Sequence, residues 1–215
     1  MIVYWILLLL TAFIAYFLGS INTMAVASLF VFRTELRRLG KGNIWLSNFR
    51  RIYGIGGFVK LLVVELIKDL LPLLIGGWLL GSKGHGDAGR AFAGFCLVLG
   101  RCYPVFNRFR GSHASICLIM AAMLVDSSIG FAVLLTTAAV CWVGRYLSLG
   151  AIVGAVVLIL AALLLINDGL IMTLSIFTGA VVLIRHVPAI SRLLNGREEK
   201  LSFQEDISYK FDEKF

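Results

Sequence analysis

Long runs of apolar residues constrain this chain more than any other feature of its sequence. The first run covers residues 2–18 without interruption, and comparable runs cover 55–80, 129–144, 146–166 and 170–184. An α-helix needs about 20 mainly apolar residues to cross the hydrocarbon core of a bilayer, which is close to the length of these runs. With 60% hydrophobic and 15% charged residues, the chain is expected to be an all-α polytopic membrane protein.

Two shorter apolar segments, at 91–99 and 114–125, complete a predicted bundle of seven transmembrane helices. The first span has no basic residues before it, so we expect it to be retained rather than cleaved as a signal peptide. A bent or interfacial helix is expected at 24–32. Residues 1–200 are predicted to form a single membrane domain, and 201–215 a solvated tail that mixes charged and aromatic residues.

The positive charges lie in alternate connections between the apolar runs. The net charge is +8, and the cations concentrate in the segments around 33–51, 101–110, 145 and 185–200. Because short cytoplasmic loops are enriched in lysine and arginine, this pattern predicts an external N-terminus and a cytoplasmic C-terminus. The same clustering argues against a nucleic-acid ligand and favours anionic lipid headgroups or small phosphorylated molecules.

Segment 39–54, LGKGNIWLSNFRRIYG, is the most polar of these connections. Its glycines permit a ligand to approach the backbone closely, and its asparagines and arginines offer hydrogen bonds and positive charge for a phosphate group. A positive-inside anchor with turn glycines is the alternative interpretation for the arginines alone.

Three charged residues lie within the second apolar run. Glu65, Lys68 and Asp69 share one face of a helix, because they are three and four positions apart. Charges at membrane depth normally pair or face a polar cavity, so Lys68 is expected either to face the site or to join a structural ion pair. The four cysteines show no spacing typical of metal ligands and are expected to be reduced packing residues.

Four separated motifs, taken together, resemble one known family. Segment 39–54 is similar to the motif GSGNIGATN of the bacterial acyl-phosphate:glycerol-3-phosphate acyltransferases (PlsY-type), and 100–117 is similar to their GHxFPVFxxFKGGKGVAT. Segments 145–149 and 185–200 resemble RYxSL and RHxxNIxRLxxGxExK. Glu65 and Lys68 fall where that family carries an acid, then LKG, then a proline, here Pro72.

The resemblance implies a bacterial inner-membrane enzyme that transfers a fatty acyl group from acyl phosphate to the 1-hydroxyl of glycerol 3-phosphate. The products would be lysophosphatidate and phosphate, and no metal or dissociable cofactor is expected. Its partners would be both substrates, or a related phosphorylated acceptor, together with membrane lipid. Because acyl phosphate already has a good leaving group, positioning and neutralisation of phosphate charge are expected to supply most of the catalysis.

The resemblance also implies the site residues. Catalytic roles fall to His186, Arg51 and Ser148. Substrate- or phosphate-binding roles fall to Lys41, Gly42, Asn43, Asn48, Lys68, Arg101, Gly111, Ser112, His113, Arg145, Gly196 and Glu198.

Several motif positions depart from the family form. The replacements are Lys41 for serine, Trp45 for glycine, Arg101 for histidine, Ser112-His113-Ala114 for Gly-Lys-Gly, and Ala189 for asparagine. Arginine cannot accept a proton, so position 101 cannot supply a base. These departures motivate an alternative function, a non-catalytic relative that binds phosphorylated lipid or regulates another enzyme. A transporter is a third interpretation, which the lack of an obvious internal repeat disfavours.

Overall fold

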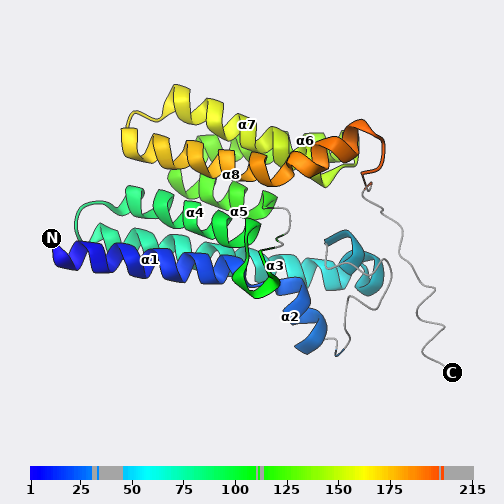
Figure 1. Cartoon of the computed structure of the whole chain (residues 1–215), viewed down its shortest axis with the longest axis horizontal. Helices are drawn as coiled ribbons and strands as arrows, with labels where there is room; N and C mark the ends of the chain where they lie inside the picture. Colours follow the sequence, from blue (N-terminus) through cyan, green and yellow to red (C-terminus); the bar gives the residue numbers. More distant parts are fainter. Residues whose placement is uncertain (31–32, 34–45, 110, 112–113, 199, 201–215) are drawn as a thin grey trace. The chain divides into compact units, whose positions relative to one another are not determined.

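The computed structural model describes residues 1–30, 33, 46–109, 111, 114–198 and 200. Within these residues the chain is entirely helical, which confirms the predicted all-α class (Figure 1). The α-helices, in chain order, are α1 (Ile2–Ser20), α2 (Thr23–Phe30), α3 (Leu46–Gly81), α4 (Gly86–Cys102), α5 (Ser115–Val125), α6 (Ser127–Gly144), α7 (Leu147–Leu165) and α8 (Gly169–Leu194). A short 3-10 helix, η2 (Val105–Asn107), lies between α4 and α5.

The chain divides into two compact units, and their boundaries cut through α3. The larger unit comprises Met1–Ile21 and Lys68–Glu199, and the smaller comprises Asn22–Ile67 and Lys200–Phe215. The larger unit therefore holds α1, the second half of α3, and α4 to α8. All interactions discussed for the candidate site lie within this larger unit.

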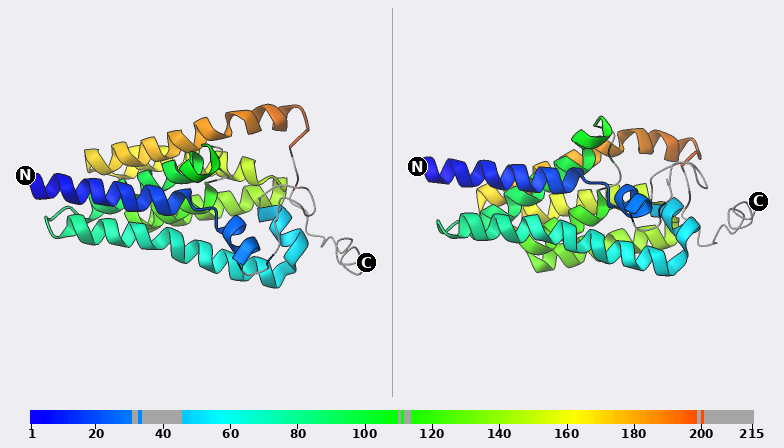
Figure 2. Two further views of the ribbon diagram at one scale, coloured as in Figure 1. Left: turned by 60° about the horizontal axis from the view of Figure 1, so that its bottom comes forward. Right: turned by 90° about the horizontal axis from the view of Figure 1, so that it is seen from below.

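Buried small and branched residues from seven helices, α1 and α3 to α8, form the core of the larger unit. Its centre includes Leu97, Leu118, Val133, Ala155 and Val182, all at most 1% exposed. Helices α1 and α4 approach each other closely because two glycines face the partner backbone. A Cβ atom at Gly19 would overlap the carbonyl oxygen of Leu97, and one at Gly100 would overlap that of Tyr16. The helices of this unit run side by side in Figures 1 and 2.

An aspartate caps the helix that follows each of two short connections between apolar runs, at 126–128 and 167–169. Asp126 Oδ1 accepts hydrogen bonds from the backbone N–H groups of Ser128 and Ile129 at 2.8 and 3.1 Å. Asp168 Oδ1 caps α8 in the same way, with N–H donors at Leu170 and Ile171. Both side chains satisfy donors that the first helical turn leaves without a partner.

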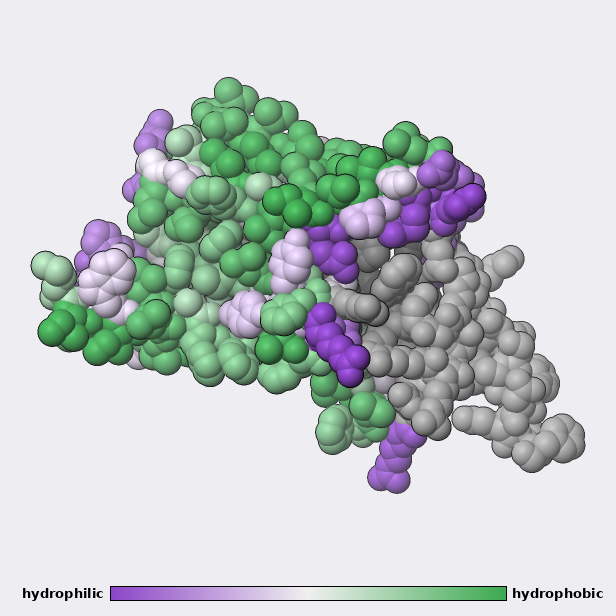
Figure 3. All heavy atoms as spheres, viewed as in Figure 1, coloured by the Kyte–Doolittle hydropathy of each residue, from purple (hydrophilic) through white to green (hydrophobic). Residues whose placement is uncertain are grey.

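The outer surface of the larger unit is apolar, as expected for a protein that lipid surrounds. Large side chains such as Phe131, Trp142, Leu164 and Phe177 are more than half exposed. Figure 3 shows hydrophobic residues over α7 and α8, with hydrophilic residues gathered toward the helix ends. Four of the described helices, α1, α6, α7 and α8, have the length and composition to cross a membrane. The predicted number of seven spans exceeds these four.

Helices α3 and α8 extend furthest beyond the apolar runs that predicted them. Helix α3 begins at Leu46 rather than near residue 55, so the second half of the polar connection 39–54 is helical instead of forming a loop. Gly54 interrupts this helix with a φ of 69°, a conformation that favours glycine. Helix α8 ends at Leu194, ten residues beyond the predicted end of the last span at 184. It therefore carries the motif that begins at Arg185.

The smaller unit confirms a short helix after the first span. Helix α2 begins directly after Asn22, whose Oδ1 accepts a hydrogen bond from the Ala25 N–H at 3.1 Å. An asparagine in this position satisfies one of the helix's unpaired N–H groups. The interruption at 19–23 is therefore a helix end followed by a new helix start.

Candidate functional site

Several predicted site segments meet at one end of the larger unit. Helix α4 ends there and α5 begins there, while α7 begins and α8 ends there (Figures 1 and 2). Hydrogen bonds join residues from these segments across sequence separations of 50 and 74 residues. The described parts of the motifs at 100–117, 145–149 and 185–200 therefore lie together.

The connection between α4 and α5 folds back on the end of α4. A Cβ atom at Gly111 would overlap the backbone carbonyl oxygens of Arg101 and Cys102, so only glycine fits this close approach. One Nη of Arg185, from α8, donates a hydrogen bond to the Gly111 carbonyl at 2.5 Å. The Tyr16 hydroxyl, from α1, donates to the Tyr103 carbonyl at 2.8 Å. Two helices thus hold this connection in place.

The N-terminus of α5 offers hydrogen-bond donors beside Gly111. Helix geometry leaves the N–H groups of its first residues without acceptors in the helix, and the N-cap residue, Ala114, provides no side-chain acceptor. Among the described residues, the buried Ser115 Oγ and Arg185 Nε also have no hydrogen-bond partner. A helix N-terminus with nearby unpaired donors and a guanidinium is suited to an anion such as phosphate.

Ser148 and Glu198 come together from the start of α7 and the segment after α8. The Ser148 hydroxyl donates a hydrogen bond to Oε1 of Glu198. Arg192 Nε donates to Oε2 of the same carboxylate at 2.6 Å, forming an ion pair. The carboxylate side chain is 4% exposed, so its two partners compensate for the cost of burying its charge. Glu198 thereby fastens the end of α8 to α7.

His186 is buried on α8 next to Arg185. Its Nδ1 lies 2.7 Å from the Val182 carbonyl oxygen. Because a carbonyl oxygen only accepts hydrogen bonds, Nδ1 carries the proton in this contact. In the neutral ring, Nε2 is then the nitrogen with a lone pair, which fits it to accept a proton or a hydrogen bond.

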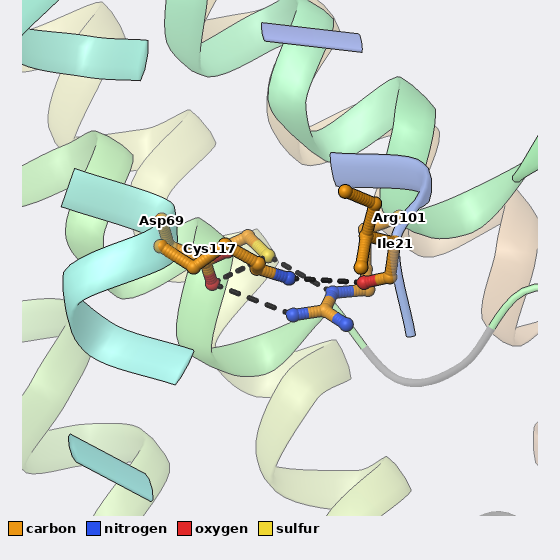
Figure 4. Close-up of polar contacts among 5 residues, drawn as sticks. Ile21, Asp69, Arg101 and Cys117 are labelled. Atoms are coloured by element: carbon orange, nitrogen blue, oxygen red, sulfur yellow. Dashed lines mark hydrogen bonds and ion pairs between the residues drawn. The ribbon is translucent and has the colours of Figure 1, made fainter. Parts of the chain in front are cut away.

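Asp69, Arg101 and Cys117 form a buried polar cluster from α3, α4 and α5 (Figure 4), and the partly buried Lys68 contacts Asp69. Lys68 Nζ lies 3.3 Å from Asp69 Oδ1 and donates to the Ile21 carbonyl at 3.1 Å. Arg101 Nη lies 3.5 Å from Asp69 Oδ2. These contacts fit the structural ion-pair alternative for Lys68.

Two further predicted residues lie at bends of the same end. Arg145 adopts a φ of 58° where α6 ends, and Gly196 adopts a φ of 65° just after α8. The remaining predicted residues cannot be placed to the same degree. Lys41, Gly42, Asn43, Ser112 and His113 lie outside the described residues, as does Trp45, and Asn48 and Arg51 are described only as backbone positions of α3.

Sequence reasoning omitted Arg185, Ser115 and Asp69 from the site. Arg185 was visible in the motif beginning at 185, beside His186, but only its bond to Gly111 shows what it does. Ser115 lies in a motif position with no recognisable chemical signature. In the sequence Asp69 stood out only as the residue next to Lys68. Its contact with Arg101 joins α3 to α4 and becomes visible only in the structure.

The structure predicts the effect of neutralising Glu198. Replacing Glu198 with glutamine is expected to lower kcat/KM about tenfold, because the charge-assisted bond from Arg192 is lost and the end of α8 loosens from α7. The measurement is the steady-state rate of the reaction that the motif resemblance implies, with the purified protein in detergent. Arg90→Ala is the matched control, since the Arg90–Asp87 pair is exposed and lies at the other end of α4. Equal activity of Glu198→Gln and wild type would contradict this role.

The four cysteines lie in or beside the packed helices. Cys96, Cys102 and Cys117 are buried and Cys141 is half-buried, all as free thiols. Within the described part of the chain, no group of three or more histidine, cysteine, aspartate or glutamate side chains is arranged to hold a metal ion.

Comparison with known proteins gives one consistent answer. The family model described as glycerol-3-phosphate acyltransferase matches residues 9–196. A glycerol-3-phosphate acyltransferase of Thermoanaerobacter pseudethanolicus is 30% identical over 198 residues, covering 92% of this chain and 98% of the relative. One of Trichlorobacter lovleyi is 31% identical over 191 residues, covering 86% of this chain and 93% of the relative.

Two solved structures share this fold. They are the glycerol 3-phosphate and lysophosphatidic acid forms of PlsY (YgiH), an integral membrane glycerol 3-phosphate acyltransferase. Their TM-scores are 0.75 and 0.74, at 27% identity, and each comparison covers 91% of this chain and 96% of the solved one.

Proposed function

This chain belongs to the glycerol-3-phosphate acyltransferase family and is a membrane acyltransferase, and from that premise we propose that acyl phosphate is its acyl donor. The products would be 1-acyl-glycerol 3-phosphate (lysophosphatidate) and inorganic phosphate. The forms in which PlsY was solved, with glycerol 3-phosphate and with lysophosphatidic acid, support a site for a phosphorylated glycerol and its acylated product.

In the proposed reaction, the 1-hydroxyl oxygen of glycerol 3-phosphate attacks the carbonyl carbon of the acyl phosphate. A carbon–oxygen ester bond forms, and the bond between the carbonyl carbon and the phosphate oxygen breaks. Phosphate leaves with the electron pair of that bond, and the hydroxyl proton passes to His186 Nε2. A proton acceptor placed at the attacking hydroxyl is typically worth 10²–10⁴-fold in rate.

The donors beside Gly111 would hold the phosphate group of glycerol 3-phosphate. The N-terminus of α5, Ser115 and Arg185 together supply N–H and O–H donors and a positive charge. Such preorganised donors stabilise the charge of a bound phosphate without having to reorganise during the reaction. The unpaired donors of Ser115 and Arg185, together with the uncapped start of α5, are the observation that carries the proposal.

The other predicted residues complete the proposed site. Ser148 and Glu198 would belong to this site, and a binding role for Arg51, Lys41, Asn43 and Asn48 of the 39–54 segment stays a prediction from the motif. The proposed topology has seven spans in the bacterial inner membrane, with the N-terminus outside. The site end of the larger unit would then face the cytoplasm, where soluble glycerol 3-phosphate is available.

A phosphate-release assay tests the donor. Purified protein in detergent or lipid is given glycerol 3-phosphate with palmitoyl phosphate, palmitoyl-coenzyme A or palmitoyl carrier protein. We expect one phosphate released per lysophosphatidate with palmitoyl phosphate, and rates at least 100-fold lower with either thioester, because only the acyl phosphate carries a phosphate bonded directly to the reacting carbonyl carbon. Faster transfer from a thioester would overturn the proposed donor, and an absence of lysophosphatidate with every donor would overturn the function.

A further inference from the structure

We propose that Asp69, Arg101 and Cys117 act as one positioning unit, in which Asp69 is the buried counter-charge that fixes Arg101 and thereby the phosphate-binding connection between α4 and α5. Each residue comes from a different helix, α3, α4 and α5 respectively (Figure 4). Asp69 is not among the site residues that the family resemblance implies. The proposal rests on the proposed function of that connection.

The contacts within the trio form a closed triangle. Arg101 Nη lies 3.5 Å from Asp69 Oδ2, and Arg101 Nε donates a hydrogen bond to Cys117 Sγ at 3.3 Å. The Cys117 thiol in turn donates to Asp69 Oδ2 at 3.0 Å. The thiol therefore connects the cation to the anion, receiving a hydrogen bond from one and giving one to the other.

Burial makes each member depend on the others. The side chains of Asp69 and Arg101 are 0% and 4% exposed, and Cys117 is fully buried. Removing one partner of a buried ion pair strongly destabilises a protein, because an uncompensated charge remains in a poorly solvated place. Replacing both partners together avoids that cost and is often nearly neutral.

The trio coincides with three departures from the family motifs. Lys68 matches the lysine of LKG, so Asp69 stands where that motif has glycine. Counting from Gly100 along GHxFPVFxxFKGGKGVAT, Arg101 stands at its histidine and Cys117 at its threonine. These three positions are far apart in the sequence, yet their side chains meet in one cluster. The simplest physical explanation is that arginine at 101 needs a buried carboxylate, which Asp69 supplies.

The backbone of Arg101 contacts the connection that carries the proposed phosphate site. It lies next to the last residue of α4, and its own carbonyl oxygen forms the surface against which Gly111 packs. Arg185 holds Gly111 from the other side. A shift of Arg101 therefore shifts Gly111 and the N-terminus of α5, where the phosphate is proposed to bind. Arg101 therefore acts as a positioning residue, and its guanidinium contacts Asp69 and Cys117.

Replacing Asp69, Arg101 and Cys117 with the residues of the family motifs tests whether these three side chains depend on one another. The variants are Asp69→Gly, Arg101→His, the double variant with both changes, and a triple variant that adds Cys117→Thr. We expect each single variant to lower kcat/KM for glycerol 3-phosphate at least tenfold per folded molecule. The double and triple variants should return to within about threefold of wild type. The assay temperature is set well below unfolding, so that a purely stabilising role would leave these values unchanged.

The measured coupling decides the outcome. If the two changes were independent, the loss of kcat/KM in the double variant would be the product of the two single losses. A double variant whose kcat/KM is at least tenfold higher than that product predicts supports the proposal. Smaller recovery, or single variants that lose stability alone, overturns it. Thermal unfolding of the same proteins without substrate provides a second cycle, which stays informative even if acyl phosphate is not the donor. Should a single variant fail to accumulate, the double variant is expected to fold, and its failure contradicts the pairing.

Discussion

Replacing His186 with alanine is expected to lower kcat about 100-fold or more, with a much smaller change in the KM for acyl phosphate. The Val182 carbonyl fixes the proton on Nδ1, which leaves Nε2 to accept the proton of the attacking hydroxyl. Loss of a positioned proton acceptor typically costs 10²–10⁴-fold in rate. Initial rates of phosphate release, measured with both substrates varied, separate kcat from KM.

A second histidine provides the control for this change. His85 is exposed at the N-cap of α4, the opposite end of that helix from Arg101. His85→Ala is expected to keep wild-type kinetics, since the residue lies far along α4 from the proposed site. Activity of His186→Ala within threefold of wild type would remove His186 from the catalytic machinery.

Adding one methyl group at Gly111 is expected to lower kcat/KM about 100-fold. The new Cβ atom would overlap the carbonyl oxygens of Arg101 and Cys102, both of which belong to the backbone of α4. The connection must therefore move away from α4, which also disturbs its bond to Arg185. A displacement of about 1 Å in groups that position a substrate can cost 10²-fold in rate.

Gly169 is the matched control, because a Cβ atom there would have no neighbour within 4 Å. Gly169→Ala lies at the first residue of α8, at the opposite end of that helix from the site, and should leave activity unchanged. The two variants are compared by turnover per folded molecule and by thermal unfolding in detergent. Full activity of Gly111→Ala would show that the close approach at Gly111 does not set the geometry of the site.

The hydrophobic pattern predicted most helices of this protein because its long apolar runs have little choice of structure in lipid. Prediction failed where helices continue into polar sequence. At 46–53 the asparagine, serine and arginines suggested a loop, yet these residues are helical up to Gly54. At 185–194, charged and polar residues alternate with apolar ones, and α8 simply continues through them. In both segments hydropathy alone was a poor guide, because a helix does not have to end where its lipid contact ends.

The candidate site was predictable in its segments but not in its pairings. The motifs at 100–117, 145–149 and 185–200 indicated which segments carry the site chemistry, and the described parts of these segments do lie together. The bond from Arg185 to Gly111 spans 74 positions, and the bond from Cys117 to Asp69 spans 48. Such contacts depend on how the helices pack. No local sequence pattern therefore identifies Asp69 as the partner of Arg101, or Arg185 as the hydrogen-bond donor to Gly111.

The central claim is that glycerol 3-phosphate binds where α4 ends, α5 begins and α8 carries His186. An experimental structure of this protein with glycerol 3-phosphate bound tests it most directly, through the position of the phosphorus atom. We predict the phosphate within hydrogen-bonding distance of Arg185 or the first N–H groups of α5, with the 1-hydroxyl facing His186. A phosphate bound instead near His85 and Asp168, at the opposite helix ends, would contradict the account.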